Sequence, residues 1–90
     1  MAFHVHAAHI LVKTEQEANV LLYELQRGAS FEKLAKDKSL CPSSKKGGDL
    51  GWFGKGQMVR EFETAAFALK PGQLSKAVKT QFGWHIIKIL

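Results

Sequence analysis

The chain has 90 residues, of which 46% are hydrophobic and 23% charged, with a formal net charge of +5. This length allows one hydrophobic core, and this composition is that of a globular protein and excludes intrinsic disorder. A single cysteine excludes an internal disulfide and a cysteine-based zinc cluster, and it fits a reducing compartment. No apolar run approaches the ~20 residues that cross a bilayer, and no signal-peptide pattern is present. We therefore expect one domain over residues 1–90, located in the cytoplasm unless it is part of a larger exported chain.

The first part of the chain predicts a strand and two helices. Residues 3–12 alternate and then become apolar, which predicts a strand with His9 on one face and His4 and His6 on the other. Because no cysteine or carboxylate lies near His4 and His6 in sequence, a frayed strand end is favoured over a metal site. Two helices are expected to follow, capped by Thr14 and Ser30. Their apolar spacing is carried by Ala18, Leu21, Leu22 and Leu25, then by Phe31, Leu34 and Ala35.

The second part begins with a long loop. Residues 39–51 are small, polar and rich in glycine, but they lack the Gly-Lys-Ser/Thr ending of a phosphate-binding loop. We then expect a short strand at 52–53, a helix around Phe62, a turn at 71–72, and strands at 74–78 and 84–90. This order predicts an α+β fold, with a small, largely antiparallel sheet packed by helices.

The last strand contains a histidine, His85, within an otherwise apolar run. Two readings are open for it. Taken alone, the stretch favours a core histidine that is hydrogen-bonded to a neighbour, and the alternative is a functional residue at a site.

Four blocks of this sequence, in this order and spacing, resemble the signature of the parvulins, which are peptidyl-prolyl cis–trans isomerases. The blocks are His9-Ile10-Leu11-Val12-Lys13, Gly47-Gly48-Asp49-Leu50-Gly51, Gly56-Gln57-Met58-Val59 with Phe62, and Phe82-Gly83-Trp84-His85-Ile86-Ile87. The resemblance implies a four-stranded antiparallel sheet surrounded by helices, as in the FKBP-like superfold. It also implies that the first and last strands are central neighbours, with His9 beside His85.

The resemblance further implies the residues of the site. The catalytic group would be His9, Cys41, Thr80 and His85, and the substrate-binding group would be Leu50, Met58, Phe62, Gln81 and Phe82. Rotation about an X–Pro peptide bond neither forms nor breaks a covalent bond, so neither a cofactor nor a metal is expected. By spacing alone Phe62 would be a core residue. For Cys41, a polar wall of the site is favoured over a covalent nucleophile.

The expected partners are proline-containing peptides and unfolded or partly folded proteins. Parvulins that require phosphoserine or phosphothreonine carry a basic cluster after the first strand, where this chain has Lys13 followed by Glu15 and Glu17. We therefore predict no phosphate requirement and a preference for uncharged, apolar residues before proline. A monomer without membrane contact is expected.

Two alternatives remain open. The first is a non-catalytic, parvulin-like module that binds peptides as a chaperone. The second is a nucleic-acid-associated domain, which the positive charge permits. It is disfavoured because the aromatic residues lie in apolar patterns and are not interleaved with the basic ones.

Overall fold

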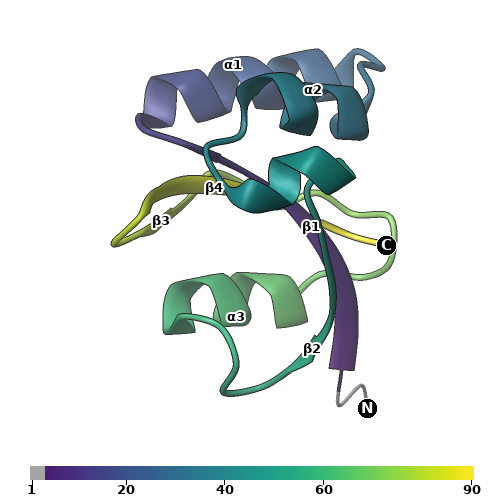
Figure 1. The fold of residues 1–90 in the computed structure, drawn as a ribbon, viewed down its shortest axis with the longest axis vertical. Helices are drawn as coiled ribbons and strands as arrows, with labels where there is room; N and C mark the ends of the chain where they lie inside the picture. Colours follow the sequence, from purple (N-terminus) through teal and green to yellow (C-terminus); the bar gives the residue numbers. More distant parts are fainter. Residues whose placement is uncertain (1–3) are drawn as a thin grey trace.

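The fold is organised on one antiparallel sheet, which we describe from a computed structural model over residues 4–90. The strand order is β2-β1-β4-β3, and each neighbouring pair is antiparallel (Figure 1). The strands are β1 (His4–Val12), β2 (Asp49–Gly54), β3 (Val78–Thr80) and β4 (Gly83–Ile89). The helices are α1 (Glu15–Gln26), α2 (Phe31–Lys38) and α3 (Arg60–Phe67), with a short 3-10 helix η1 (Pro42–Lys46). The predicted α+β fold with a four-stranded antiparallel sheet is confirmed.

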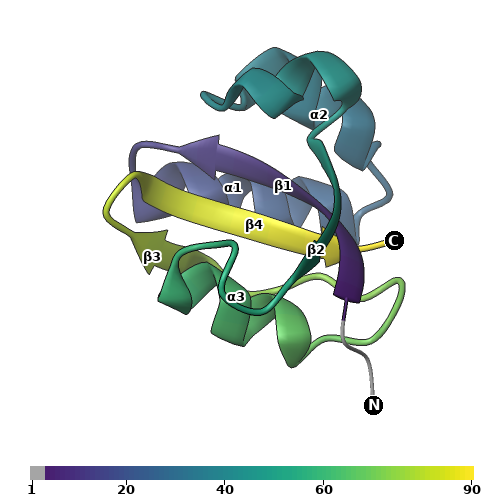
Figure 2. The ribbon, with the colours of Figure 1, turned by 60° about the horizontal axis from the view of Figure 1, so that its bottom comes forward.

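The two central strands are the first and the last. In the antiparallel register of β1 and β4, His9 lies opposite Ile87 and Leu11 lies opposite His85. Figure 2 shows β4 running between β1 and β3. The expectation that the first and last strands are neighbours is thus confirmed, and this pairing brings together two histidines that are 76 residues apart in sequence.

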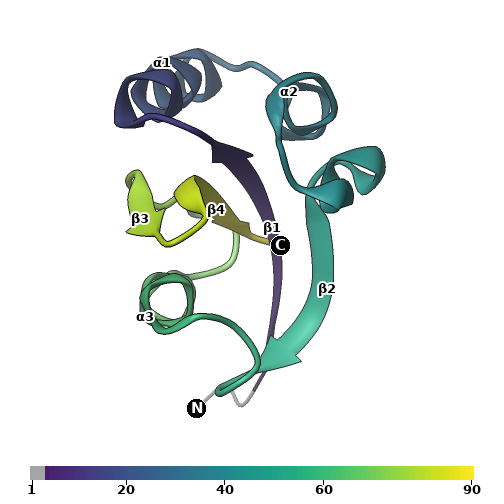
Figure 3. The same cartoon turned by 60° about the vertical axis from the view of Figure 1, so that its left-hand side comes forward.

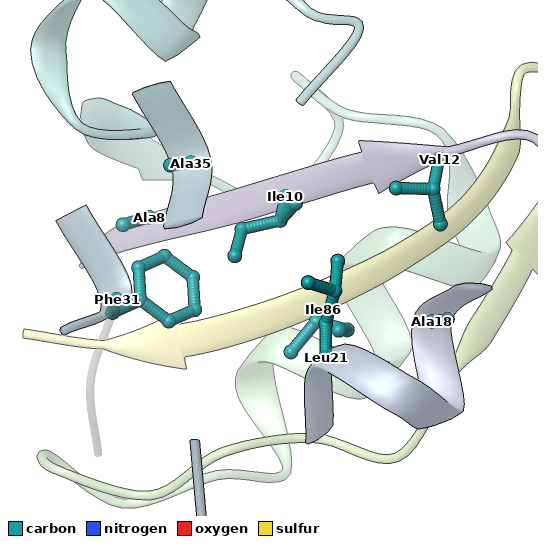
Figure 4. Packing of buried hydrophobic residues seen from close by; sticks show 8 residues of the cluster. All are labelled: Ala8, Ile10, Val12, Ala18, Leu21, Phe31, Ala35 and Ile86. Carbon is teal, nitrogen blue, oxygen red and sulfur yellow. The ribbon is translucent and has the colours of Figure 1, made fainter. Parts of the chain in front are cut away.

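Helices cover both faces of the sheet, with α1 and α2 on one side and α3 on the other (Figure 3). Under α1 and α2, Ile10 and Ile86 are fully buried. They pack with the cluster shown in Figure 4, which consists of Ala8, Ile10, Val12, Ala18, Leu21, Phe31, Ala35 and Ile86. Each buried isoleucine contributes on the order of 2 kcal/mol. The predicted caps are present, because Thr14 accepts from Glu17 N–H and Ser30 accepts from Lys33 N–H.

The face under α3 carries the second core and also the histidines. Phe62 and Ala66 of α3 are buried against Val5, Ala7, Phe53, Ile87 and Ile89. His9 and His85 have the same strand parity as these residues and therefore project from the same face. The ring centroid of Phe62 lies 5.4 Å from that of His9 and 5.3 Å from that of His85. The two histidines are thus enclosed between the sheet and α3.

Several predicted boundaries differ from the structure. The segment expected to be a loop at 39–51 contains η1 and the start of β2, since β2 begins at Asp49 and not at residue 52. The strand expected at 74–78 is reduced to a single bridge between Leu74 and Lys88, and β3 begins only at Val78. The β1 end is paired with β2 from His4 onward, so it is not frayed. Residue 3, the predicted start of the strand, lies outside the described residues. Within residues 4–90, no helix has the length and apolarity needed to span a membrane.

Candidate active site

A chain of hydrogen bonds joins three buried polar side chains, one each from β1, β4 and β3. His9 Nδ1 lies 2.9 Å from His85 Nδ1, and His85 Nε2 lies 2.7 Å from Thr80 Oγ1. Thr80 Oγ1 also accepts from Phe82 N–H, at 3.1 Å. The exposed fractions of His9, His85 and Thr80 are 5%, 4% and 6%. We call these three residues the histidine cluster.

The histidine cluster has two possible proton arrangements, because a neutral imidazole carries one N–H. In the first, His9 Nδ1–H donates to His85 Nδ1, and His85 Nε2–H donates to Thr80. In the second, the Thr80 hydroxyl donates to His85 Nε2, and His85 Nδ1–H donates to His9. In both, His9 Nε2 has no partner among the described residues. The tautomers of the two rings are therefore coupled, and each ring fixes that of the other.

Burial keeps both rings of the histidine cluster neutral. Desolvation, and secondarily the facing His85 ring, lowers the pKa of His9 from 6.5 to about 4. Desolvation also lowers the pKa of His85. A neutral pair can share a hydrogen bond between two Nδ1 atoms, which two imidazolium rings cannot do.

These lowered pKa values predict that acid destabilises the fold. In the unfolded chain His9 binds a proton below its ordinary pKa of 6.5, whereas in the folded chain it stays neutral until about pH 4. Stability is therefore complete above pH 6.5 and falls as the pH drops toward 4. From pH 7.5 to pH 5, His9 alone should cost about 2 kcal/mol, and His85 adds to this loss in the same direction.

Urea unfolding at several pH values between 5 and 7.5 measures the slope of the unfolding free energy against pH. This interval lies above the range in which carboxylates titrate. His9→Asn removes the imidazole and should reduce the slope. A wild-type unfolding free energy that stays constant over this range would contradict the prediction.

An apolar groove of about 460 Å³ adjoins the histidine cluster. Its walls come from the segment before η1, from β2 and from the start of α3, and both histidines contribute to its lining. The lining residues are His9, Leu11, Leu40, Cys41, Pro42, Leu50, Gln57, Met58, Val59, Phe62, Phe82 and His85. Small-molecule and peptide side-chain sites have this character, with many apolar contacts and few polar ones.

A β-bulge directs Leu50 toward the groove. The register between β1 and β2 shifts at Leu50, which has no partner in β1. Asp49 Oδ1 accepts from Gly51 N–H at 2.7 Å and is 2.8 Å from His6 Nε2, so it closes a turn around the bulge. The Gly51 N–H first, and then the His6 ring, lower the pKa of Asp49. His6 thus has a carboxylate partner in space that is 43 residues away in sequence.

Seven of the nine predicted site residues line the groove, and they are His9, Cys41, Leu50, Met58, Phe62, Phe82 and His85. The other two do not line it. Thr80 is buried behind His85, and Gln81 is exposed in the turn between β3 and β4. The expected hydrogen-bonded group of four is also smaller, because Cys41 makes no side-chain hydrogen bond to the histidine cluster in the described part of the chain.

Five groove residues were not predicted, namely Leu11, Leu40, Pro42, Gln57 and Val59. Leu11 shares the strand face of His9, so the two-residue period was a signal for it. Gln57 and Val59 belong to a recognised sequence block, although no role was assigned to them. Leu40 and Pro42 flank Cys41, and their side chains carry no local pattern that indicates a groove.

Comparisons with known proteins agree with this geometry. Residues 8–90 match the rotamase family described as the PPIC-type PPIASE domain. The foldase protein PrsA of Geobacillus sp. (strain WCH70) is 55% identical over 86 residues, which cover 94% of this chain and 31% of that protein. The crystal structure of the peptidylprolyl isomerase PrsA from Bacillus anthracis has a TM-score of 0.94 at 52% identity, covering 96% of this chain and 40% of that one. NmPin, the parvulin of Nitrosopumilus maritimus, has a TM-score of 0.90 at 44% identity, covering 100% of this chain and 98% of that one.

The fold of this chain is that of the parvulin domains. The chain belongs to the PPIC-type rotamase family, the parvulins. The family inferred from the four sequence blocks is confirmed. The chain spans about a third of the length of the PrsA relative and nearly all of NmPin.

Proposed function

We propose that this domain rotates X–Pro peptide bonds without a covalent intermediate, and that it assists the folding of unfolded or partly folded proteins. The observation that carries the proposal is the apolar groove lined by the paired neutral imidazoles of His9 and His85. The foldase name of the PrsA relative supports the role in folding. The monomeric state and the cytoplasmic location expected from the sequence stay predictions.

Catalysis of X–Pro rotation requires a site that holds the proline ring and an electrostatic environment that suits the twisted amide. The X–Pro amide resists rotation with a barrier of ~18–20 kcal/mol, because its C–N bond has partial double-bond character. Uncatalysed exchange takes tens to hundreds of seconds. Twisting the amide removes its resonance, so the carbonyl becomes more ketone-like and the nitrogen more basic. A site that fits the twisted amide better than either planar form accelerates the exchange.

The grip on the proline ring is assigned to Leu50, Met58 and Phe62. Methionine adapts its shape, and the aromatic ring offers a flat wall for the pyrrolidine. Each ring methylene that leaves water contributes about 0.8 kcal/mol of binding. Phe62 is also 3% exposed and belongs to the core under α3, so its core role and its wall role coexist.

The polar side of the site is assigned to His9, His85 and Cys41. Their lining of the groove supports a role in adjusting the field around the substrate carbonyl. Thr80 does not line the groove, so we assign it a positioning role, in which it holds the orientation of His85 through the 2.7 Å hydrogen bond.

An assay of cis–trans exchange tests the proposal. Exchange in a capped X–Pro tetrapeptide is followed by NMR with wild-type protein and with His9→Ala, which makes the use of a protease unnecessary. We expect accelerated exchange with the wild-type protein and a large loss in the variant. A folded wild-type domain that binds unfolded protein but leaves the exchange rate unchanged would show a non-catalytic peptide-binding module instead.

Replacing Cys41 by alanine should leave substantial activity. Rotation requires no nucleophile, so loss of the sulfur changes only the polarity of one wall, and kcat/KM should fall by roughly threefold to tenfold. A matched Cys41→Ser variant, which restores a hydroxyl donor, should be closer to wild type. If Cys41→Ala stayed folded but no longer accelerated cis–trans exchange of the peptide, the result would favour the covalent mechanism over the non-covalent one.

The preference for the residue before proline should exclude phosphate. The turn after β1 contains Lys13, and it is followed by Glu15 and Glu17 in the first turn of α1, both of them exposed. The two carboxylates outnumber the one lysine, so this segment should repel a dianionic phosphate more than it attracts it. In a tetrapeptide series, kcat/KM should therefore be highest for leucine or alanine and about tenfold lower for phosphoserine. A phosphoserine peptide as the best substrate would overturn this expectation.

A further inference from the structure

The turn between β2 and α3 brings a polar side chain, Gln57, to the edge of the apolar groove. Gly54 N–H donates to Gln57 Oε1 at 2.6 Å. Gln57 is also one of the residues that line the groove. A backbone N–H can only donate, so the atom that faces Gly54 is the amide oxygen, and the NH₂ group points elsewhere. That NH₂ group makes no hydrogen bond to any of residues 4–90.

A peptide in this groove needs hydrogen-bond donors for its own carbonyl groups. A buried carbonyl that loses water without gaining a donor costs about 1–3 kcal/mol. Most lining residues are apolar, and His9 and His85 already bond each other through their Nδ1 atoms. The Cys41 thiol is a weak donor. The Gln57 NH₂ group is thus an unpaired strong donor on the lining in either proton arrangement of the histidine cluster, whereas His9 Nε2 carries a proton in only one of them.

The Gln57 side chain is already held in place in the free protein. Its oxygen is fixed by Gly54 N–H, and the same turn is anchored to α3, because Gly56 N–H donates to Glu63 Oε1. A free glutamine side chain loses up to about 2 kcal/mol of rotamer freedom when it becomes ordered. Since the fold has ordered Gln57 before any ligand arrives, binding does not have to do so.

We propose that Gln57 is a substrate-binding residue, whose side-chain NH₂ donates a hydrogen bond to a main-chain carbonyl of the bound prolyl peptide. This inference rests on the proposed function. It gives a role to a residue of the Gly56-Gln57-Met58-Val59 block that packing does not explain, since Gln57 is exposed.

Two variants of Gln57 separate the donor from the tether. Gln57→Glu keeps an oxygen that can accept from Gly54 N–H but has no N–H of its own, and Gln57→Met keeps the length but has neither. The substrate is the uncharged peptide acetyl-Ala-Leu-Pro-Phe-amide, and the readouts are KM, kcat and the urea midpoint of unfolding. We expect both variants to raise KM roughly threefold to tenfold, with kcat within about twofold of wild type. Only the methionine variant should lower the urea midpoint.

The pattern across the two variants decides the matter. If only Gln57→Met raises KM, the residue acts through the tether alone and the inference is wrong. It is also wrong if only Gln57→Glu raises KM, because that result reports the added charge, or if neither variant does. A wild-type domain without isomerase activity is a different outcome, since it overturns the proposed function and this inference with it.

Discussion

Replacing His85 by alanine should lower kcat/KM for an X–Pro peptide by about a hundredfold, which corresponds to about 2.7 kcal/mol of transition-state stabilisation. His85 is the middle member of the histidine cluster, with one ring nitrogen bonded to His9 and the other to Thr80. Without it, the His9 ring loses the partner that fixes its tautomer. The Thr80 hydroxyl loses its bond to the site at the same time.

The same substitution also costs stability, so the activity needs a matched control. An alanine at position 85 leaves a cavity on a central strand, leaves His9 Nδ1 unpaired and removes one of the two partners of Thr80 Oγ1, at a cost of about 2–4 kcal/mol. Ile89 lies on the same strand and the same face and is 3% exposed, but it does not line the groove. Ile89→Ala should lose about 2–5 kcal/mol of stability and keep most of its activity. Equal activity losses in the two variants would mean that His85→Ala loses activity through general destabilisation.

A double-mutant cycle tests whether the histidine cluster acts as a unit. Thr80→Val preserves the shape of the side chain and removes the hydroxyl that bonds His85 Nε2. If Thr80 acts through His85, this change should lower activity in the wild-type background and add little in the His85→Ala background. Additive losses in the two backgrounds would mean that Thr80 acts independently.

The sequence predicted the elements of this fold better than their pairing. The capping residue Thr14 and the apolar stripe of α1 are local features, so they were legible without knowing what the helix packs on. The pairing of β1 with β4 joins the two ends of the chain, and nothing in the sequence of either strand indicates which strand it pairs with. The resemblance to a family supplied that pairing, and the structure confirmed it.

The missed boundaries have identifiable physical causes. The segment around Leu74 is apolar enough for a strand. However, the Ser75 side chain takes the place of a backbone carbonyl in the hydrogen bonding to β4. Its hydroxyl accepts from Ile87 N–H, and its own N–H donates to Ile87 O. The start of β2 was hidden because glycines are depleted in strands and the bulge at Leu50 breaks the two-residue alternation.

The candidate site was predictable in its residues and less so in its geometry. Cys41, in the segment before η1, lines the groove as expected, but it makes no side-chain bond to the histidine cluster in the described chain. Gln81 and Thr80 are both next to the β3–β4 turn, yet one points to solvent and the other into the core. A sequence block fixes which residues are near one another, whereas the direction of each side chain depends on strand parity and on packing around it.

Gly48→Ala should destabilise the fold by about 3–5 kcal/mol. Gly48 has a φ of +86°, and a Cβ added there would lie 2.4 Å from the backbone oxygen of His9 and 3.2 Å from Ala35 Cβ. The oxygen belongs to the central strand β1 and cannot move aside as a flexible side chain would. Gly48 O also accepts from His9 N–H at 2.9 Å, so the methyl group forces apart a backbone contact that holds His9 in place.

Gly72→Ala is the matched control for this prediction. Gly72 has a nearly equal φ of +88°, but a Cβ there meets nothing within 4 Å, and Gly72 does not line the groove. It should therefore cost only the backbone strain, about 1–2 kcal/mol. Urea unfolding gives both free energies, and exchange of an X–Pro peptide measured on the folded fraction shows whether His9 has moved. Because Gly48 is bonded to the backbone of His9, Gly48→Ala should lower activity per folded molecule, whereas Gly72→Ala should leave it unchanged. Equal stability losses at the two positions would mean that β1 yields to the added methyl group, and that the close approach of Gly48 does not hold His9 at the groove.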